Sequence, residues 1–183
     1  MSTPVITFRP ITGEDMPMLF EWLTRPHVAE WWDSPATLAD TIAEYDPRVT
    51  PDPTTRVYIA LADGAPVGYI QSYVAMGSGD GWWTDVTDPG LRGIDQFLAD
   101  TSHLGRGLGT AMVSAFVAQL FEDPAVTRVQ VDPHPANARA IRCYAKAGFV
   151  GVREIETPDG RAWLMIRERG ASYRGAESRG QSP

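Results

Sequence analysis

The spacing of apolar residues near the start of the chain predicts a strand followed by two helices. Residues 7–9 are typical of a short strand. Thr12 and Asp15 then form a pair typical of a helix-capping box, and the apolar positions behind it are Met16, Leu19, Phe20 and Leu23. A second helical pattern at Leu38, Ile42 and Tyr45 ends where three prolines occur within residues 46–53.

Alternating apolar positions in the middle of the chain predict an antiparallel hairpin. Its strands span residues 56–62, with Val57, Ile59 and Leu61 pointing inward, and residues 67–74, with Asp63 and Gly64 at the turn. Residues 76–90 are rich in Gly, Asp and Trp and are expected to form a structured loop. A further strand is expected at 93–99.

The last third of the chain predicts a helix, a strand and a second helix. The first helix begins near Gly109, and its apolar face is Met112, Val113, Phe116, Val117 and Leu120. Residues 128–131 form a buried strand, and residues 137–147 form a helix closed by Gly148.

A terminal hairpin is expected at 149–155 and 162–166, with a turn at 158–160. Residues 170–183, rich in Gly, Ser and Arg, are expected to be a disordered tail behind a single domain at 1–169. This order of elements predicts an α/β protein with a mixed sheet and helices on both faces.

Composition and charge narrow the class of protein. The chain has 183 residues, enough for one core, with 43% hydrophobic residues and neither a signal segment nor a long apolar run. A cytoplasmic protein without membrane contact is expected, and monomer and homodimer both stay open. The net charge of −7 argues against nucleic-acid binding and favours a cationic substrate, although acidity can also serve solubility alone.

Metal chemistry is not expected. Cys143 is the single cysteine, so neither a disulfide framework nor a cysteine metal site is predicted. His27, His103 and His134 are too scattered in the sequence to suggest a metal cluster.

Gly105, Gly107 and Gly109 fall between a predicted strand and a predicted helix. Backbone amides freed by glycine at a helix N-terminus can hold a phosphate, although the same spacing also suits a simple tight turn. A dinucleotide fold would place such a loop after its first strand, and a P-loop would need lysine before Thr110. Both nucleotide alternatives are therefore weakened.

Two segments in the correct order resemble the GCN5-related N-acetyltransferase (GNAT) superfamily. Its acetyl-CoA loop reads Arg/Gln-x-x-Gly-x-Gly/Ala, and residues 104–109 match it except that Leu104 replaces Arg or Gln. The segment 137–149 is similar to the superfamily pattern Asn-x-x-Ala-x-x-x-Tyr-x-x-x-Gly-Phe. The resemblance implies the GNAT fold, with a mostly antiparallel mixed sheet flanked by helices, and acetyl-CoA as co-substrate.

More narrowly, most of the chain resembles the aminoglycoside 6'-N-acetyltransferases. The similar runs are 20–23, 30–32, 68–73, 77–83, 92–96 and 157–160, whereas residues 33–55 match less well. This resemblance implies acetylation of a polycationic aminoglycoside and, as a consequence, antibiotic resistance.

The resemblance also implies a cofactor site. Its loop residues are Leu104, Gly105, Arg106, Gly107, Leu108, Gly109 and Thr110. Backbone amides from Asp95 through Gln96, Phe97 and Leu98 would hold the thioester carbonyl, and Asn137 would contact the pantetheine arm.

Two residues are expected to be catalytic. The resemblance gives Tyr144 the role of hydrogen-bonding or protonating the leaving thiolate, with a core tyrosine as the alternative. Asp95 would meet the reacting amine. A carboxylate of pKa ~4 cannot fully deprotonate an amine of pKa ~8–9 without an uphill step of roughly 5–7 kcal/mol. We therefore expect Asp95 to orient the amine, and to accept its proton, directly or through water, only if burial raises its pKa.

Further residues are expected around the acceptor. Asp80, Asp132 and Asp159 would join Asp95 in selecting a polycation, although Asp80 and Asp159 lie beside glycine and could merely cap turns. Trp32, Trp82 and Trp83 could present flat faces to sugar rings or could pack the core. Two other functions stay open: an acyltransferase for a siderophore precursor or other small amine, and a non-catalytic acetyl-CoA-binding module.

Overall fold

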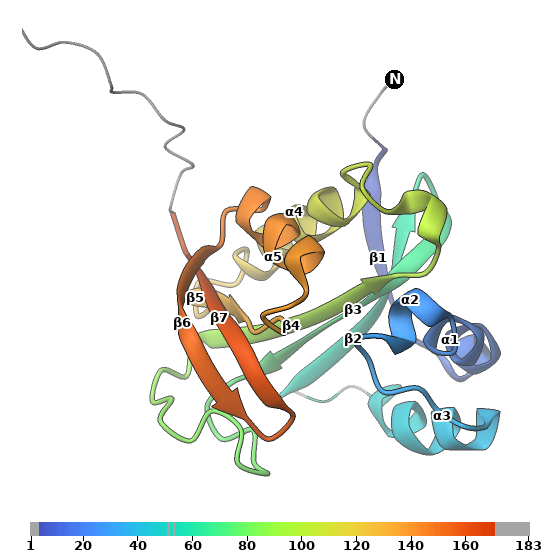
Figure 1. The fold of residues 1–183 in the computed structure, drawn as a ribbon, viewed down its shortest axis with the longest axis horizontal. Helices are drawn as coiled ribbons and strands as arrows, with labels where there is room; N and C mark the ends of the chain where they lie inside the picture. The colour runs from blue at the N-terminus through green and yellow to red at the C-terminus, as the bar shows by residue number, and fades with distance from the viewer. Residues whose placement is uncertain (1–3, 51, 53, 171–183) are drawn as a thin grey trace, which may run out of the picture.

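The computed structural model describes residues 4–50, 52 and 54–170, which form a seven-stranded sheet with helices on both faces (Figure 1). The strands are β1 (Ile6–Pro10), β2 (Thr55–Ala62), β3 (Ala65–Val74), β4 (Leu91–Leu98), β5 (Arg128–Val131), β6 (Val150–Thr157) and β7 (Gly160–Glu168). The α-helices are α1 (Met16–Leu23), α2 (Pro26–Ala29), α3 (Leu38–Tyr45), α4 (Leu108–Leu120) and α5 (Ala138–Lys146). Apart from Gly170, the expected tail lies outside the described residues.

The sheet is mixed and mostly antiparallel, as predicted. Its strand order is β1-β2-β3-β4-β5-β7-β6, and β4 with β5 is the parallel pair among otherwise antiparallel neighbours. None of the helices in the described part of the chain is long and apolar enough to cross a membrane.

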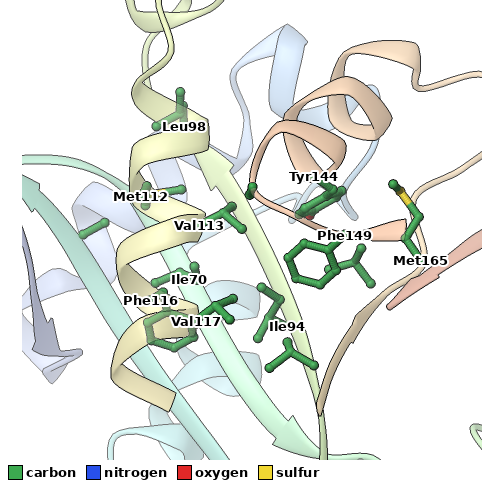
Figure 2. Packing of buried hydrophobic residues seen from close by; sticks show 14 of the residues in the cluster. Ile70, Ile94, Leu98, Met112, Val113, Phe116, Val117, Tyr144, Phe149 and Met165 are labelled. Carbon is green, nitrogen blue, oxygen red and sulfur yellow. The ribbon is translucent and has the colours of Figure 1, made fainter. Parts of the chain in front are cut away.

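Each face of the sheet carries its own apolar cluster. On one face, α4 and α5 pack over Ile70 and Ile94 (Figure 2). On the other, α1 and α3 pack over Tyr69 and Phe97. Because side chains alternate along a strand, neighbouring residues such as Tyr69 and Ile70 serve opposite faces. Being covered on both sides makes the central strands apolar at successive positions.

The structure confirms every helix and strand expected from the sequence, with small differences at their ends, and adds α2. This four-residue helix begins at Pro26 and is too short to produce a periodic pattern. Of the three apolar positions that predicted α3, only Tyr45 is buried. Leu38 and Ile42 are 36% and 42% exposed, whereas Thr41 and Tyr45 are buried. Tyr45 lies edge-on to Tyr69 of β3, and this contact sets the rotation of the helix.

The sheet opens between β4 and β5. Their ladder covers three pairs and ends at Gly93 and Gln130, whereas β3 follows β4 as far as Leu98. Residues 94–98 therefore have a β3 partner but no β5 partner in the described ladder. Backbone groups at such an opening are free to bind a ligand.

Candidate active site

Asp95 lies on β4 just beyond the point where β5 separates. It faces the α1 side of the sheet beside Gln71 of β3, whose Nε2 donates to Asp95 Oδ2 at 2.8 Å. Burial raises the pKa of Asp95, and the negative charge of Asp159 adds to this effect. The hydrogen bond from Gln71 and the charge of Arg48 oppose it. The net upward shift fulfils the condition under which this carboxylate could accept a proton.

Asp132, directly after β5, shares the electrostatic field of Asp95. Burial is the main cause that raises the pKa of Asp132 to about 7, and the charges of Asp95 and Asp159 raise it further. Burial and the charge of Asp159 disfavour ionisation of Asp95 and Asp132, and an ammonium group placed beside them would relieve this cost. A group titrating near pH 7 is also well matched to proton transfer at neutral pH.

The structure separates Asp80 from this group. Asp80 is exposed in the loop after β3 and has a left-handed backbone with φ of 50°. Within the described residues, no hydrogen bond or charge effect links it to Asp95 or Asp132. Asp159 is also exposed in a turn, but its charge reaches both of those carboxylates.

Tyr144 approaches the opening from the other face of the sheet. It is 6% exposed on α5 and packs edge-on against Phe149, with ring centroids 5.6 Å apart (Figure 2). Burial raises the pKa of Tyr144 well above its ordinary value, the side chain of Gln96 opposes this, and the charge of Asp95 adds to it. Tyr144 is thus both a core residue and a neutral hydroxyl beside Gln96.

Two glycines of the loop before α4 have left-handed backbone conformations. Gly105 and Gly107 have φ of 71° and 86°, and a Cβ at either would meet no atom within 4 Å, so glycine serves backbone conformation there. Gly107 is the N-cap of α4, whose first amides have no intrahelical acceptor. Leu104 packs against the apolar cluster under α4, which accounts for leucine where the superfamily has Arg or Gln.

A cavity of about 230 Å³ joins the glycine loop to β4 and α5. It is lined by Gln96, Phe97 and Leu98, by most of the loop, and by Asn137, whose Oδ1 also caps α5 by accepting from Ala140 N at 3.0 Å. Three basic residues that sequence reasoning missed also line it: Arg139, Arg142 and Lys146. Their spacing of three and four places them on one face of α5, and this was the available signal.

The three tryptophans line two different cavities. Trp32 lines the same cavity but also belongs to the core, because its ring lies 5.2 Å from Phe97 and its Nε1 donates to Tyr45 Oη at 3.1 Å. Trp82 and Trp83 line a second cavity of about 240 Å³ between the 76–90 loop and the β6–β7 hairpin. Trp83 Nε1 donates to Tyr73 Oη at 3.1 Å, which fixes one of these rings.

This arrangement has a counterpart among known proteins. A family model described as an acetyltransferase (GNAT) domain matches residues 12–157. The chain belongs to the GNAT family. The expected GNAT fold is confirmed, with the glycine loop and Tyr144 on the face of the sheet that carries α4 and α5.

Individual GNAT relatives cover nearly the whole chain. Aminoglycoside N(6')-acetyltransferase type 1 of Klebsiella pneumoniae is 52% identical over 176 residues, which is 94% of this chain and 88% of the relative. A crystal structure of the aminoglycoside acetyltransferase AAC(6')-Ib with coenzyme A and kanamycin has a TM-score of 0.86 and 55% identity, covering 90% of this chain and 95% of that one. A lysine N-acyltransferase of Mycobacterium tuberculosis is 29% identical over 84% of this chain and 73% of its own length.

Sequence reasoning also missed Arg48 and Gln71 of this GNAT site. Gln71 lay within a run used for the resemblance but was given no role, and Arg48 lies in the poorly matched 33–55 segment. Arg48 donates a hydrogen bond to Gln71, and Gln71 donates one to Asp95, so both contacts join parts of the chain that are distant in sequence. Nothing in the local sequence indicates those contacts.

Proposed function

We propose that this chain transfers the acetyl group of acetyl-CoA to the 6'-amine of aminoglycosides. The observation that carries the proposal is the placement of Asp95, Asp132 and Asp159 in one electrostatic field at the opening of the sheet. A polycation is the ligand that such a group of carboxylates favours. The extensive similarity to aminoglycoside N(6')-acetyltransferase type 1 supports the same acceptor.

Acetyl-CoA occupies the groove between the glycine loop and α5. Amides at the N-terminus of α4 receive the pyrophosphate, with Arg139, Arg142 and Lys146 supplying positive charge. Asn137 contacts the pantetheine arm. Unpaired backbone groups of β4 beyond Gly93 hold the thioester carbonyl and stabilise the negative charge that develops on its oxygen.

The amine attacks the thioester carbon directly. Asp95 orients the substrate ammonium and takes the proton whose loss creates the nucleophile, directly or through water. The new C–N bond forms, the C–S bond breaks, and the second proton passes from nitrogen to water as the amide is completed. Tyr144 donates a hydrogen bond or a proton to the departing sulfur, so the products are the N-acetyl aminoglycoside and coenzyme A.

An alternative function for this site differs from the proposed one only in the acceptor. The lysine N-acyltransferase relative keeps open a small cellular amine as acceptor. Such an amine carries fewer positive charges than an aminoglycoside and makes less use of three neighbouring carboxylates. Thiol release from acetyl-CoA should therefore be compared for kanamycin, lysine and simple amines.

The position of acetylation can be tested with a matched pair of acceptors. An aminoglycoside with a 6'-amine should release thiol, and the analogue with a 6'-hydroxyl should not. Equal turnover of both analogues would reject acetylation at the 6' position. Preference for lysine over kanamycin would reject the aminoglycoside as the substrate.

A further inference from the structure

A chain of hydrogen bonds connects Arg48, in the short 3-10 turn that follows α3, to Asp95. Arg48 Nη1 donates to Gln71 Oε1 at 3.1 Å, and Gln71 Nε2 donates to Asp95 Oδ2 at 2.8 Å. Tyr69 Oη also donates to Gln71 Oε1, at 2.7 Å. Arg48 and Tyr69 thus converge on the amide oxygen of Gln71, and the amide nitrogen of Gln71 holds one oxygen of the carboxylate.

This arrangement allows one orientation of the Gln71 amide. Its oxygen accepts from a guanidinium and a hydroxyl, so its nitrogen must face the carboxylate. A flipped amide would place N–H groups against both donors and its oxygen against Asp95. A cation at the oxygen end of the amide also polarises it and strengthens the donor at the nitrogen end.

Arg48 is itself held in place. Its guanidinium pairs with Glu44 one helical turn earlier and lies over the ring of Tyr45, 5.0 Å from the centroid. With 31% of the side chain exposed, Arg48 is shielded enough for its charge to act on Asp95. Together with the hydrogen bond from Arg48 to Gln71, these contacts link the end of α3 to the sheet.

Arg48 is the cation that acts on Asp95, whereas several groups oppose it. Charged or titratable groups facing this region come from β3, from the segment after β5, from α5 and from the β6–β7 turn: Tyr69, Tyr73, Asp132, Tyr144 and Asp159. None of these supplies positive charge. Among the described residues, Arg48 and Gln71 are thus the pair that lowers the pKa of Asp95, against the upward effects of burial and of neighbouring negative charge.

We propose that Arg48 and Gln71 are positioning residues that fix Asp95 Oδ2, leave Asp95 Oδ1 for the substrate amine, and keep the carboxylate ionised. The inference deepens the acetyltransferase function proposed above and rests on it. It also assigns a role to part of the 33–55 segment, which resembles the aminoglycoside 6'-N-acetyltransferases less well than the rest of the chain does. Neither residue needs to touch the substrate.

The pH dependence of turnover tests this proposal. Without Arg48, the pKa of Asp95 rises further, so the acidic limb of kcat against pH should move to higher pH by about 1 pH unit in Arg48→Gln. Gln71→Glu keeps an acceptor for Arg48 and Tyr69 but replaces the donor with a second carboxylate, and should move the limb further. Arg48→Lys retains the charge and should restore the limb toward the wild-type position.

Arg56→Gln is the matched control, because it removes one positive charge from an exposed residue of neighbouring β2. Its acidic limb should coincide with that of the wild type. Superimposed limbs for wild type, Arg48→Gln and Gln71→Glu would overturn the proposal, as would an equal shift in Arg56→Gln. Thermal unfolding of each variant separates loss of structure from loss of positioning.

A second measurement is independent of the acceptor. The carboxyl carbon of Asp95 can be titrated by NMR in the unliganded protein and assigned through its loss in Asp95→Asn. A higher midpoint in Arg48→Gln than in wild type and Arg56→Gln supports the proposal, and unchanged midpoints overturn it. Lack of transfer by the wild type to any aminoglycoside would instead refute the proposed function.

Discussion

Gly109 of α4 lies against Cys143 of α5, where a Cβ on the glycine would come within 3.4 Å of the cysteine sulfur. Thr110 Oγ1 is 3.7 Å from the same atom. This contact brings the first turn of α4 against the middle of α5. The glycine loop and the Asn137 cap, which lie far apart in the sequence, consequently border one groove.

Gly107→Ala should weaken acetyl-CoA binding through backbone conformation. A residue with Cβ at φ of 86° costs about 1–2 kcal/mol of folding free energy. Gly64→Ala, at φ of 84° in the β2–β3 turn, is the matched control with equal strain and no cofactor contact. Denaturant unfolding should show similar losses for both variants. KM for acetyl-CoA should rise in Gly107→Ala alone, and an equal rise in both would remove the loop from the cofactor site.

Tyr144→Phe should lower kcat by about 100-fold or more, because the leaving sulfur loses its donor. KM for acetyl-CoA should change little, since the ring and its contact with Phe149 remain. Tyr58→Phe is the control: that ring packs on Phe116 on the same face of the sheet, and no hydrogen bond of its hydroxyl is found within the described residues. Undiminished kcat in Tyr144→Phe would reduce Tyr144 to a core residue.

The raised pKa of Asp132 should appear in the pH dependence of stability. The folded carboxyl titrates at about 7 and the ordinary value is 3.8, so the folded state binds the proton more tightly. The resulting stabilisation is fully present below pH 3.8 and is lost as the pH rises through about 7. Asp132→Asn lacks this loss, so its Tm relative to wild type should increase between pH 5 and 8. Parallel Tm curves would contradict the assigned shift.

Asp159→Asn should move the acidic limb in the direction opposite to Arg48→Gln. The charge of Asp159 raises the pKa of Asp95 and of Asp132, so its removal should lower both. KM for kanamycin should rise several-fold because one carboxylate no longer attracts the polycation. Glu122→Gln, an exposed change of equal charge beyond the end of α4, should leave both quantities unaltered. An unchanged acidic limb of kcat against pH would show that Asp159 affects binding of the acceptor but not the pKa of Asp95.

Local sequence patterns were sufficient for most of the fold. The apolar positions of α1 and α4 recur every three or four residues, and glycine or proline marks most ends of elements. In α3, Tyr45 is buried against Tyr69, 24 positions later in the chain, whereas Leu38 and Ile42 of the same apolar pattern are exposed. Tertiary packing overrode the local pattern there.

The candidate site divides in the same way. Gly107, Asn137 and Tyr144 belong to short motifs whose spacing expresses helix geometry, so the sequence could point to them. The contact between Gln71 and Asp95 depends on the register of β3 against β4. Arg48 lies in the 33–55 segment, where the resemblance is weaker. Such contacts are settled by tertiary structure, and one sequence does not display them.

Because the ladder between β4 and β5 is short, the sheet is open between these two strands. Asp95 lies on one face of the sheet and Tyr144 on the other, so the amine and the thioester would approach the opening from opposite faces. Both substrates can therefore be bound at the same time, and the transfer does not require a covalent acetyl-enzyme. When initial rates are measured at varied concentrations of acetyl-CoA and aminoglycoside, the lines of the double-reciprocal plot should therefore intersect. Parallel lines would instead indicate transfer through an acetylated enzyme.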